Sequence, residues 1–296
     1  MKSDAKANSK ASKIRAFGDL PPEFAEFQRA KAAILPIPFD GTSTWGKGAD
    51  GGPAAMLEAS ANMELYDIET GSEVYRQGIF TAEPVLADTP EEVAERGFAA
   101  CNKLLEAGKF VLTFGGEHSI SYGPIKAHAA KYQNLSVLQL DAHTDLRDSY
   151  HGSRHNHACI MARAKELVGT VVQVGIRSMD RSELGLLDRK KAFFAEHIHG
   201  STTWIAKVVD LLSENVYLTV DLDVFDPGVL PSTGTPEPGG LTWYQVLELI
   251  REVSRQRNLV GCDVVELAPS PASPASDFLA AKLVYKILTY KFCPAR

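Results

Sequence analysis

The chain lacks most features that mark secreted, membrane-embedded or nucleic-acid-binding proteins. Its four cysteines are widely spaced over 296 residues and form no Cys-x-x-Cys pair, which argues against a disulfide framework. No apolar run approaches the roughly 20 residues that a membrane helix needs. Acidic residues exceed basic ones, for a net charge of −6, which argues against a nucleic-acid partner. The charged N-terminus is followed by no apolar stretch, so it is not a secretory signal. We therefore expect a cytoplasmic protein with reduced, buried thiols.

Internal repeats, low-complexity blocks and long linkers are also missing. Residues 1–15 are polar, and we predict that they form a poorly ordered tail. The remaining residues, 16–296, are predicted to form a single domain, since one pattern of elements continues along them.

That pattern is an alternation of short apolar runs with longer amphipathic stretches. Runs rich in Val, Ile, Leu or Phe are typical of strands buried on both faces, and they occupy 33–38, 110–114, 135–140, 171–175, 216–220 and 260–265. Helical patterns occupy 89–107, 121–131, 203–213 and 242–256. The alternation predicts a mainly parallel sheet with helices on both faces, an α/β fold. Ligands of such sheets bind at the carboxyl ends of the strands.

Acidic and histidine residues follow three of the predicted strands directly. The segments are Gly115–Ser119, Asp141–Asp145 and Asp221–Asp223. Residues at i, i+2 and i+4 of an extended segment point to the same side, so these side chains converge. They can hold two metal ions about 3.5–4 Å apart. The predicted metal ligands are His118, Asp141, His143, Asp145, Asp221 and Asp223.

Each segment alone has an ordinary explanation. An isolated Asp-x-His-x-Asp fits a solvated loop, and an isolated Gly-Gly-x-His fits a turn. All three at strand ends favour a site, because four clustered carboxylates repel one another unless a cation lies between them. Mixed His and Asp ligands suit a borderline-hard ion such as Mn²⁺.

These motifs resemble those of the ureohydrolase family, which includes arginases and agmatinases. The matching segments are Gly115–Ser119, Asp141–Asp145 and Thr219–Pro227, with Thr219 in place of the usual serine, and Pro231–Gly240 is similar as well. The resemblance implies a three-layer α/β/α fold with an eight-stranded, mainly parallel sheet, as in arginases and deacetylases. It also implies a homotrimer or homohexamer and two Mn²⁺ per subunit, although Ni²⁺, Co²⁺ or Fe²⁺ would suit the same ligands.

The resemblance also implies which residue holds which ion. One metal would take His118, Asp141, Asp145 and Asp221, and the other Asp141, His143, Asp221 and Asp223. Asp141 and Asp221 would then bridge the two ions. A hydroxide between the metals would attack the guanidinium carbon of the substrate, and Asp145 would orient it.

Two further catalytic residues follow from the resemblance. Glu266 matches the family glutamate that pairs with the guanidinium, and a carboxylate fits that planar cation; the alternative is a surface ion pair. His157 matches the histidine that passes a proton to the leaving amine. His155 is its competitor in the same run of histidines, although the sequence after His157 favours the latter.

The resemblance implies that the substrate is a small cationic guanidine. Arg147 stands where arginases carry an asparagine that binds the α-carboxylate, and this departure argues against arginine. Asp180 and Glu183 are candidates for facing a distal ammonium, and exposed loop acids are the plainer interpretation of both. Arg147, Asp180 and Glu183 are thus the candidate substrate-binding residues. We predict hydrolysis of agmatine to putrescine and urea, a step of polyamine biosynthesis.

Other functions remain open at this point. Within the family, the substrate can be aminopropylagmatine, guanidinobutyrate, a small guanidine or arginine. A non-catalytic regulatory member would use the fold as a binding module, although every expected ligand is present. A deacetylase of similar architecture would use a single zinc ion, so the number of bound metals separates that alternative.

Overall fold

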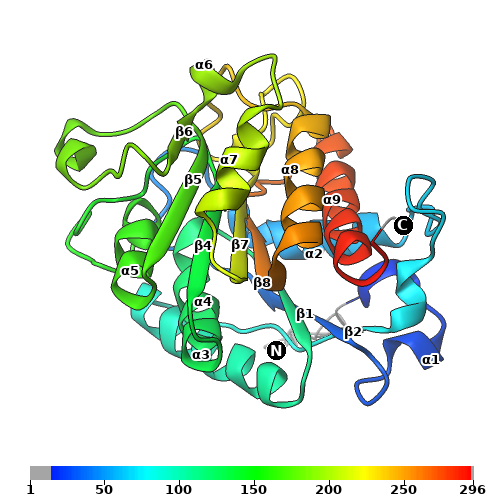
Figure 1. Cartoon of the computed structure of the whole chain (residues 1–296). Helices are drawn as coiled ribbons and strands as arrows, with labels where there is room; N and C mark the ends of the chain where they lie inside the picture. The colour runs from blue at the N-terminus through cyan, green and yellow to red at the C-terminus, as the bar shows by residue number, and fades with distance from the viewer. Residues whose placement is uncertain (1–14, 295–296) are drawn as a thin grey trace, which may run out of the picture.

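One sheet of eight parallel strands forms the centre of the molecule (Figure 1). The computed structural model describes residues 15–294, so the expected N-terminal tail lies, apart from its last residue, outside the described residues. The strand order is β2-β1-β3-β8-β7-β4-β5-β6, and every neighbouring pair is parallel. The strands are β1 (Ala32–Ile37), β2 (Ile79–Thr81), β3 (Phe110–Gly115), β4 (Leu135–Leu140), β5 (Thr170–Ile176), β6 (Ala192–Phe194), β7 (Asn215–Asp221) and β8 (Asn258–Val265). The predicted fold class is confirmed.

All six strands predicted from apolar runs are present, within a few residues of their expected bounds. The two strands that the pattern missed, β2 and β6, lie at the edges of the sheet and have three residues each. A run of three residues shows no periodicity, so only the pairing with a longer neighbour defines these strands.

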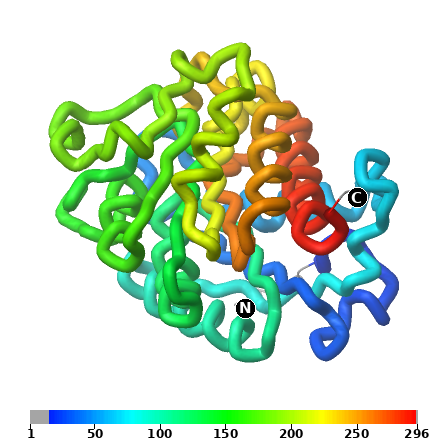
Figure 2. Tube along the Cα trace, viewed as in Figure 1, coloured from blue at the N-terminus to red at the C-terminus, as the bar shows by residue number. Residues whose placement is uncertain are grey.

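Helices cover both faces of the sheet. On one face, α7 (Trp204–Leu211), α8 (Trp243–Gln256), α9 (Ala275–Phe292) and α2 (Gly52–Ser60) pack in a row (Figure 1), and the trace of Figure 2 shows α9 beside α8. On the other face lie α3 (Pro90–Glu106), α4 (Tyr122–Lys131) and α5 (Ile160–Leu167). The one-turn helices α1 (Pro22–Ala25) and α6 (Ala195–Ile198) complete the set within residues 15–294.

The sequence pattern predicted α3, α4, α7 and α8 and missed α2, α5 and α9. The longest of the missed helices, α9, is buried over most of its second half, from Ala280 to Tyr290. A helix that is buried nearly all round lacks the polar face that gives an amphipathic period. The predicted start of α8 is confirmed in detail, since Thr242 and Gln245 form a capping box there.

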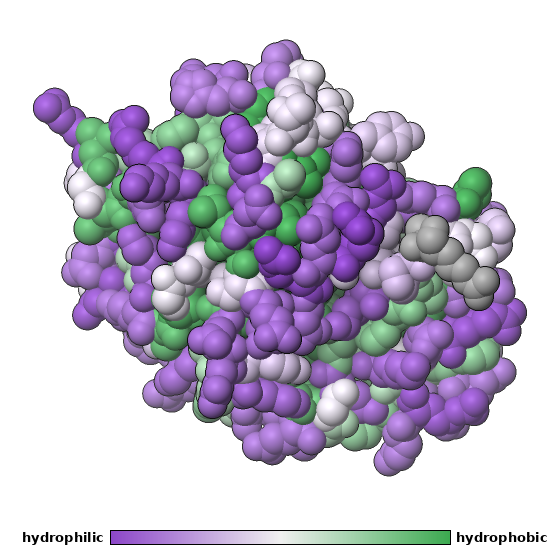
Figure 3. Space-filling model, in the orientation of Figure 1, coloured by the Kyte–Doolittle hydropathy of each residue, from purple (hydrophilic) through white to green (hydrophobic). Residues whose placement is uncertain are grey.

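The hydrophobic core lies in two layers, one on each side of the sheet. Every residue of β1, β3 and β4 is buried, as expected for strands covered on both faces. The visible surface is mostly polar with scattered apolar patches (Figure 3). Within residues 15–294, no helix has the length and apolar character needed to cross a membrane. The four cysteines are free, and three of them are buried.

The four central strands, β3, β8, β7 and β4, end side by side. Because all strands run in the same direction, their carboxyl ends bring three predicted motifs and Glu266 to one edge. The loop after β3 also packs closely on the loop after β1: a Cβ on Gly116 would lie 1.9 Å from the Phe39 carbonyl oxygen. Only glycine fits at that position, which explains why the motif has Gly at 116.

Candidate metal centre

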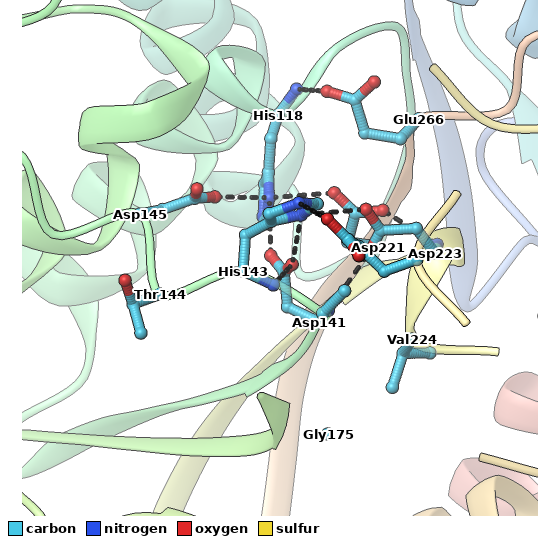
Figure 4. A network of polar contacts seen from close by, with 12 residues as sticks. His118, Asp141, His143, Thr144, Asp145, Gly175, Asp221, Asp223, Val224 and Glu266 are labelled. Carbon is cyan, nitrogen blue, oxygen red and sulfur yellow. Dashed lines mark hydrogen bonds and ion pairs between the residues drawn. The ribbon is translucent and has the colours of Figure 1, made fainter. Parts of the chain in front are cut away.

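Two groups of side chains at this edge have ligand atoms close enough to hold a metal ion. The inner group consists of His118, Asp141 and Asp221, and the outer group consists of Asp141, His143 and Asp223. Within each group the ligand atoms lie within 4.8 Å of one another, and Asp141 belongs to both (Figure 4). The convergence that the sequence predicted for these five residues is therefore present.

The inner group is enclosed by the protein. Nδ1 of His118 lies 3.1 Å from Asp141 Oδ2 and 3.3 Å from Asp221 Oδ2. The sixth predicted ligand, Asp145, also faces this point, with its Oδ2 3.2 Å from the same nitrogen. Three carboxylates thus surround one imidazole nitrogen of His118, whose side chain is only 1% exposed.

The outer group is more open. Nδ1 of His143 lies 2.9 Å from Asp223 Oδ2 and 3.6 Å from Asp141 Oδ1, and the His143 side chain is 26% exposed. Asp223 also accepts a hydrogen bond from the Ala142 N–H at 3.0 Å, which ties the loop after β7 to the loop after β4.

The backbone is strained at two of the predicted site residues. Asp145 has φ 52° and Glu266 has φ 66°, both in the left-handed region that non-glycine residues rarely adopt. Such strain persists where the surrounding structure holds a side chain in a required direction, and it is common at functional sites. The Asp145 carboxylate faces the cluster, and the Glu266 carboxylate points to the backbone N–H of His118 (Figure 4).

The cluster contains more buried carboxylates than cationic groups, so added positive charge would stabilise it. Burial, together with the charge of Asp141, raises the pKa of Asp145 to about 7. Burial and the charges of Asp223 and Asp141 raise the pKa of Asp221 well above its usual value. Burial alone would lower the pKa of His143, but Asp223 and Asp141 raise it to about 12. Protons on the imidazoles balance this excess of carboxylates in part, and divalent cations would balance it directly.

The residues behind His118 fix which ring nitrogen faces the cluster. Nε2 of His118 lies 2.8 Å from Thr219 Oγ1, and the Thr219 hydroxyl donates a hydrogen bond to Asp263 Oδ1 at 2.6 Å. Tyr217 donates to the other oxygen of Asp263 at 2.7 Å. With the Thr219 proton directed to Asp263, Thr219 accepts from Nε2–H, so that Nδ1 is the ring nitrogen left to face the carboxylates and a metal ion. This is the arrangement that a metal-binding histidine needs.

These observations fit a divalent metal pair. His118 Nδ1 is buried and has no hydrogen-bond partner of acceptable geometry, although three carboxylates lie close to it. A metal ion is the partner that satisfies such a nitrogen, and the His and Asp donor set suits Mn²⁺, Co²⁺, Ni²⁺ or Fe²⁺ better than a structural thiolate zinc.

A cavity of about 260 Å³ opens onto the metal groups. His157 and Glu266 line it, together with His118, Asp145 and Asp221. Burial, followed by the nearby His118 and His143, lowers the pKa of His157 to about 4, so this imidazole is neutral at neutral pH. His155 does not line the cavity and packs edge-on against the Tyr122 ring, 4.9 Å between centroids. The geometry therefore favours His157 over His155.

Glu266 lies at the end of β8 beside the inner group. Its Oε1 accepts the backbone N–H of His118 at 2.7 Å (Figure 4). Burial, together with the charge of Glu117, raises the pKa of Glu266 well above its usual value. A planar cation entering the cavity would offset that carboxylate charge. The alternative of a surface ion pair does not fit, since Glu266 is buried.

The three candidate substrate-binding residues all line the cavity but differ in availability. Both oxygens of Glu183 accept backbone N–H groups, from Leu146 and Asp180, at 2.7 Å each. This buried carboxylate caps a helical turn, and it is therefore a poor candidate for contacting a distal ammonium. Asp180 has its Oδ2 3.6 Å from Arg147, whose guanidinium lies over the Tyr150 ring at 4.3 Å. The negative charge of Asp180 thus partly offsets the positive charge of Arg147.

Several cavity or support residues carried no signal in the sequence. Thr44, Tyr150 and Thr235 line the cavity, and none belongs to a motif with an evident chemical role. Asp263 lies three positions before Glu266 in β8. The alternation of residues along β8 does not indicate that Asp263 accepts a hydrogen bond from Thr219, which in turn contacts His118. The hydroxyl that Thr219 shares with the usual serine of the family was the sequence feature that could have indicated this hydrogen bond.

The fold and the site together define a class: metal-dependent enzymes built on a parallel α/β sheet, with the metal groups at its carboxyl edge. Comparison with known proteins is specific within that class. The sequence model described as "Arginase family" matches residues 30–289. The chain belongs to this family of ureohydrolases, whose members depend on a dinuclear metal centre.

Relatives agree over nearly the whole chain. The N(1)-aminopropylagmatine ureohydrolase of Synechocystis sp. is 40% identical over 88% of this chain and 89% of its own length. The agmatinase of Pyrococcus horikoshii is 33% identical over 89% and 93%. The crystal structure of agmatine ureohydrolase of Thermoplasma volcanium superposes with a TM-score of 0.80 at 31% identity, covering 91% and 92%.

Proposed function

We propose that this protein hydrolyses the guanidino group of a linear polyamine precursor, releasing urea and an amine, with two Mn²⁺ per subunit. The observation that carries the proposal is the position of Glu266: a buried carboxylate on the wall of the cavity, beside two groups of metal ligands. A guanidinium that pairs with this carboxylate has its central carbon near the metal groups. When bound, the ions supply positive charge that lowers the pKa of a water and provides a nucleophile at neutral pH.

The atoms of the reaction balance without any further reactant. Water adds its oxygen to the guanidinium carbon, the bond from that carbon to the alkyl nitrogen breaks, and a proton passes to that nitrogen. The products are urea and an alkylammonium ion. His157 is neutral and lines the cavity, so it is available to accept and release that proton. Asp145 faces the inner group and is available to orient the water.

Two substrates fit this proposal, agmatine and its N1-aminopropyl derivative. Both carry a cationic amine where arginine has a carboxylate. Agmatine, which would give putrescine, is the substrate that the sequence predicted. Relatives called aminopropylagmatine ureohydrolases are 40%, 37%, 36% and 32% identical to this chain, whereas the Pyrococcus and Bacillus agmatinases are 33% and 34% identical. The three highest of these identities belong to aminopropylagmatine ureohydrolases. That order favours aminopropylagmatine as the preferred substrate, with agmatine second.

A panel of guanidines tests the proposal. The Mn²⁺-loaded protein is incubated with aminopropylagmatine, agmatine, guanidinobutyrate, guanidine and arginine, and urea release is measured. We expect kcat/KM to be highest for aminopropylagmatine, followed by agmatine. A higher value for arginine or guanidinobutyrate would show that Arg147 binds a substrate carboxylate. Urea release from none of the five by a protein with two bound metals would instead favour the non-catalytic alternative.

A single substitution separates the guanidinium site from the metal site. Glu266→Gln keeps the shape of the side chain and removes its charge. We expect KM to rise and kcat to fall while two metals remain bound. The matched control is Glu95→Gln on the exposed side of α3, which should retain full activity. The cytoplasmic location and the trimer or hexamer remain predictions of the same proposal, the latter testable by light scattering.

A further inference from the structure

Arg177, the residue that follows β5, lies against two parts of the loop that follows β7. Its Nη2 donates to the Asp223 carbonyl at 2.5 Å and to the Glu237 carbonyl at 2.8 Å. Its Nε donates to the Pro238 carbonyl at 3.1 Å, and its Nη1 donates to the Gly175 carbonyl at 3.1 Å. A guanidinium is a rigid fork of five N–H donors, so this one side chain joins the end of β5 to both parts of the loop.

The backbone of Arg177 closes a cycle of hydrogen bonds around one candidate metal ligand. The Arg177 N–H donates to the Ala142 carbonyl at 2.8 Å. The Ala142 N–H donates to Asp223 Oδ1 at 3.0 Å, and the Asp223 carbonyl accepts from the Arg177 guanidinium. Every donor in this cycle is an amide or guanidinium N–H, so each bond has one possible direction. Because Ala142 stands between Asp141 and His143, the cycle fixes Asp223 relative to the other two members of the outer group.

The outer group depends on such bonds because Asp223 does not lie on a strand. Asp221, the corresponding member of the inner group, is the last residue of β7 and pairs with β8. Asp223 lies in the 3-10 turn Leu222–Val224, beyond the last residue of the strand. Arg177 holds this turn at Asp223 and also donates to the Phe225 carbonyl, just after the turn, at 3.3 Å. The backbone groups of a turn outside the sheet find their partners in side chains, and here Arg177 provides them.

The hydrogen bonds of the Arg177 guanidinium separate a geometric role from an electrostatic one. Within residues 15–294, all of them go to backbone carbonyl oxygens and none goes to a carboxylate. The positive charge of Arg177 by itself would repel a metal ion at the neighbouring group. A contribution of Arg177 to metal binding must therefore come from the hydrogen bonds that position the ligands.

We propose that Arg177 is a positioning residue for the outer metal group, which holds Asp223 in register with Asp141 and His143 so that the three bind an ion together. This inference rests on the proposed function in one respect, that the outer group holds a metal ion. The planar fork of arginine reaches the carbonyls of Asp223 and Glu237 at the same time. Lysine has the same charge but no fork, so it does not replace arginine here.

Calorimetric titration of the metal-free, full-length protein with Mn²⁺ tests the inference. Arg177→Met keeps most of the length of the side chain and removes its N–H groups. We expect affinity for one of the two ions to fall by roughly 10- to 100-fold, while affinity for the other stays close to that of the wild type. The weakened ion should be the same one that Asp223→Asn weakens, which identifies it as the outer ion. Arg177→Lys should show most of the same loss.

Arg257 provides the matched control at the opposite end of the sheet, directly before β8. Its guanidinium donates to the Val209 and Leu212 carbonyls at 2.8 and 3.1 Å. Arg257→Met therefore breaks hydrogen bonds of the same kind away from the metal groups. Thermal unfolding of the metal-free proteins measures the loss of stability in each variant, and we expect a loss of metal affinity in Arg177→Met but not in Arg257→Met.

Several results would overturn the inference. Unchanged or higher affinity for both ions in Arg177→Met would leave only the repulsion by its charge. Equal loss for both ions, or a similar loss in Arg257→Met, would assign Arg177 a general role in stability. Wild-type affinities in Arg177→Lys would show that the fork is not needed, and this variant decides the question if Arg177→Met does not fold. A wild type that binds a single ion would overturn the inference as well.

Failure of the proposed function is distinguishable from failure of this inference. The titration uses Mn²⁺ alone and no substrate. A wild type that releases urea from no guanidine still reports the affinities of its two ions, and the comparison with Arg177→Met remains complete.

Discussion

The inner and outer metal groups have the same composition, one histidine and two aspartates, but different surroundings. Behind the inner His118 stand Thr219, Asp263 and Tyr217, all buried and hydrogen-bonded in series. Behind the outer His143 lies Glu237, with its Oε1 3.9 Å from Nε2 and its side chain 38% exposed. The inner histidine thus has buried, hydrogen-bonded partners, whereas the partner of the outer histidine is exposed, and Asp145 adds a further carboxylate at the inner group. We expect the inner ion to bind more tightly and to exchange more slowly.

The residue shared by both groups should give the largest effect. Asp141→Ala removes a carboxylate from the inner and the outer group, so we expect both ions to be lost. Activity should fall by roughly 1,000-fold or more, because the metal ions supply several kcal/mol of the catalytic effect. Metal content by mass spectrometry is the measurement, with the exposed Asp210→Ala as control. Retention of two ions in Asp141→Ala would show that the groups do not depend on a common ligand.

Loss of the hydrogen bond between His118 and Thr219 should have the second largest effect on metal binding. Thr219→Val breaks the link between His118 and Asp263, and we expect affinity for the tighter ion to fall by roughly 10- to 100-fold. Thr219→Ser preserves the hydroxyl and is the matched control. Calorimetric titration of the metal-free protein with Mn²⁺ resolves the two ions. If Thr219→Val weakened only the looser ion, the assignment of tight binding to the inner group would be wrong.

The buried wall behind the inner group should also make the fold sensitive to acid. His128 packs on the Tyr217 ring, 4.8 Å between centroids, and burial lowers its pKa to about 4. The unfolded chain takes up a proton near pH 6.5 that the folded protein does not, so stability is lost as pH falls from 6.5 toward 4. The expected loss between pH 7.5 and pH 5 is about 2 kcal/mol.

Urea unfolding at the two pH values measures this effect, with a chelator present so that metal release does not contribute. His128→Gln has no titrating ring and should show a smaller difference between pH 7.5 and pH 5. Equal pH dependence of both proteins would mean that His128 does not carry the effect.

Loss of the contact between His143 and Glu237 should have the smallest effect on metal binding. Glu237→Gln removes the exposed carboxylate near His143, and we expect affinity for the looser ion to change by less than about fivefold, as for other exposed ion pairs. Glu95→Gln again serves as control. A loss as large as that in Thr219→Val would erase the distinction between the two groups.

The sequence predicted much of the architecture because buried strands have an unmistakable composition. The strands that end in candidate ligands, β3, β4 and β7, were all found, and Asp141 and His143 converge as their spacing predicted. Asp223 joins them from a 3-10 turn over Leu222–Val224 that follows β7, not from an extended segment. The short edge strands and the largely buried α9 were missed, because neither shows a clear hydrophobic period. Asp180 and Glu183 looked equivalent in the sequence, but hydrogen bonds to the backbone occupy both oxygens of Glu183.

Sequence by itself predicted the six longer strands of the sheet, the edge at which they end and the candidate metal ligands, because each of these follows from composition and spacing along a single segment. The tertiary structure alone decided what stands behind each ligand: Asp263 behind His118, Glu237 beside His143, and Arg177 against the carbonyl of Asp223. These partners come from other strands and loops. A hydrogen bond between residues 46 positions apart leaves no mark on the spacing of either segment, since it exists only once the sheet has brought the loops together.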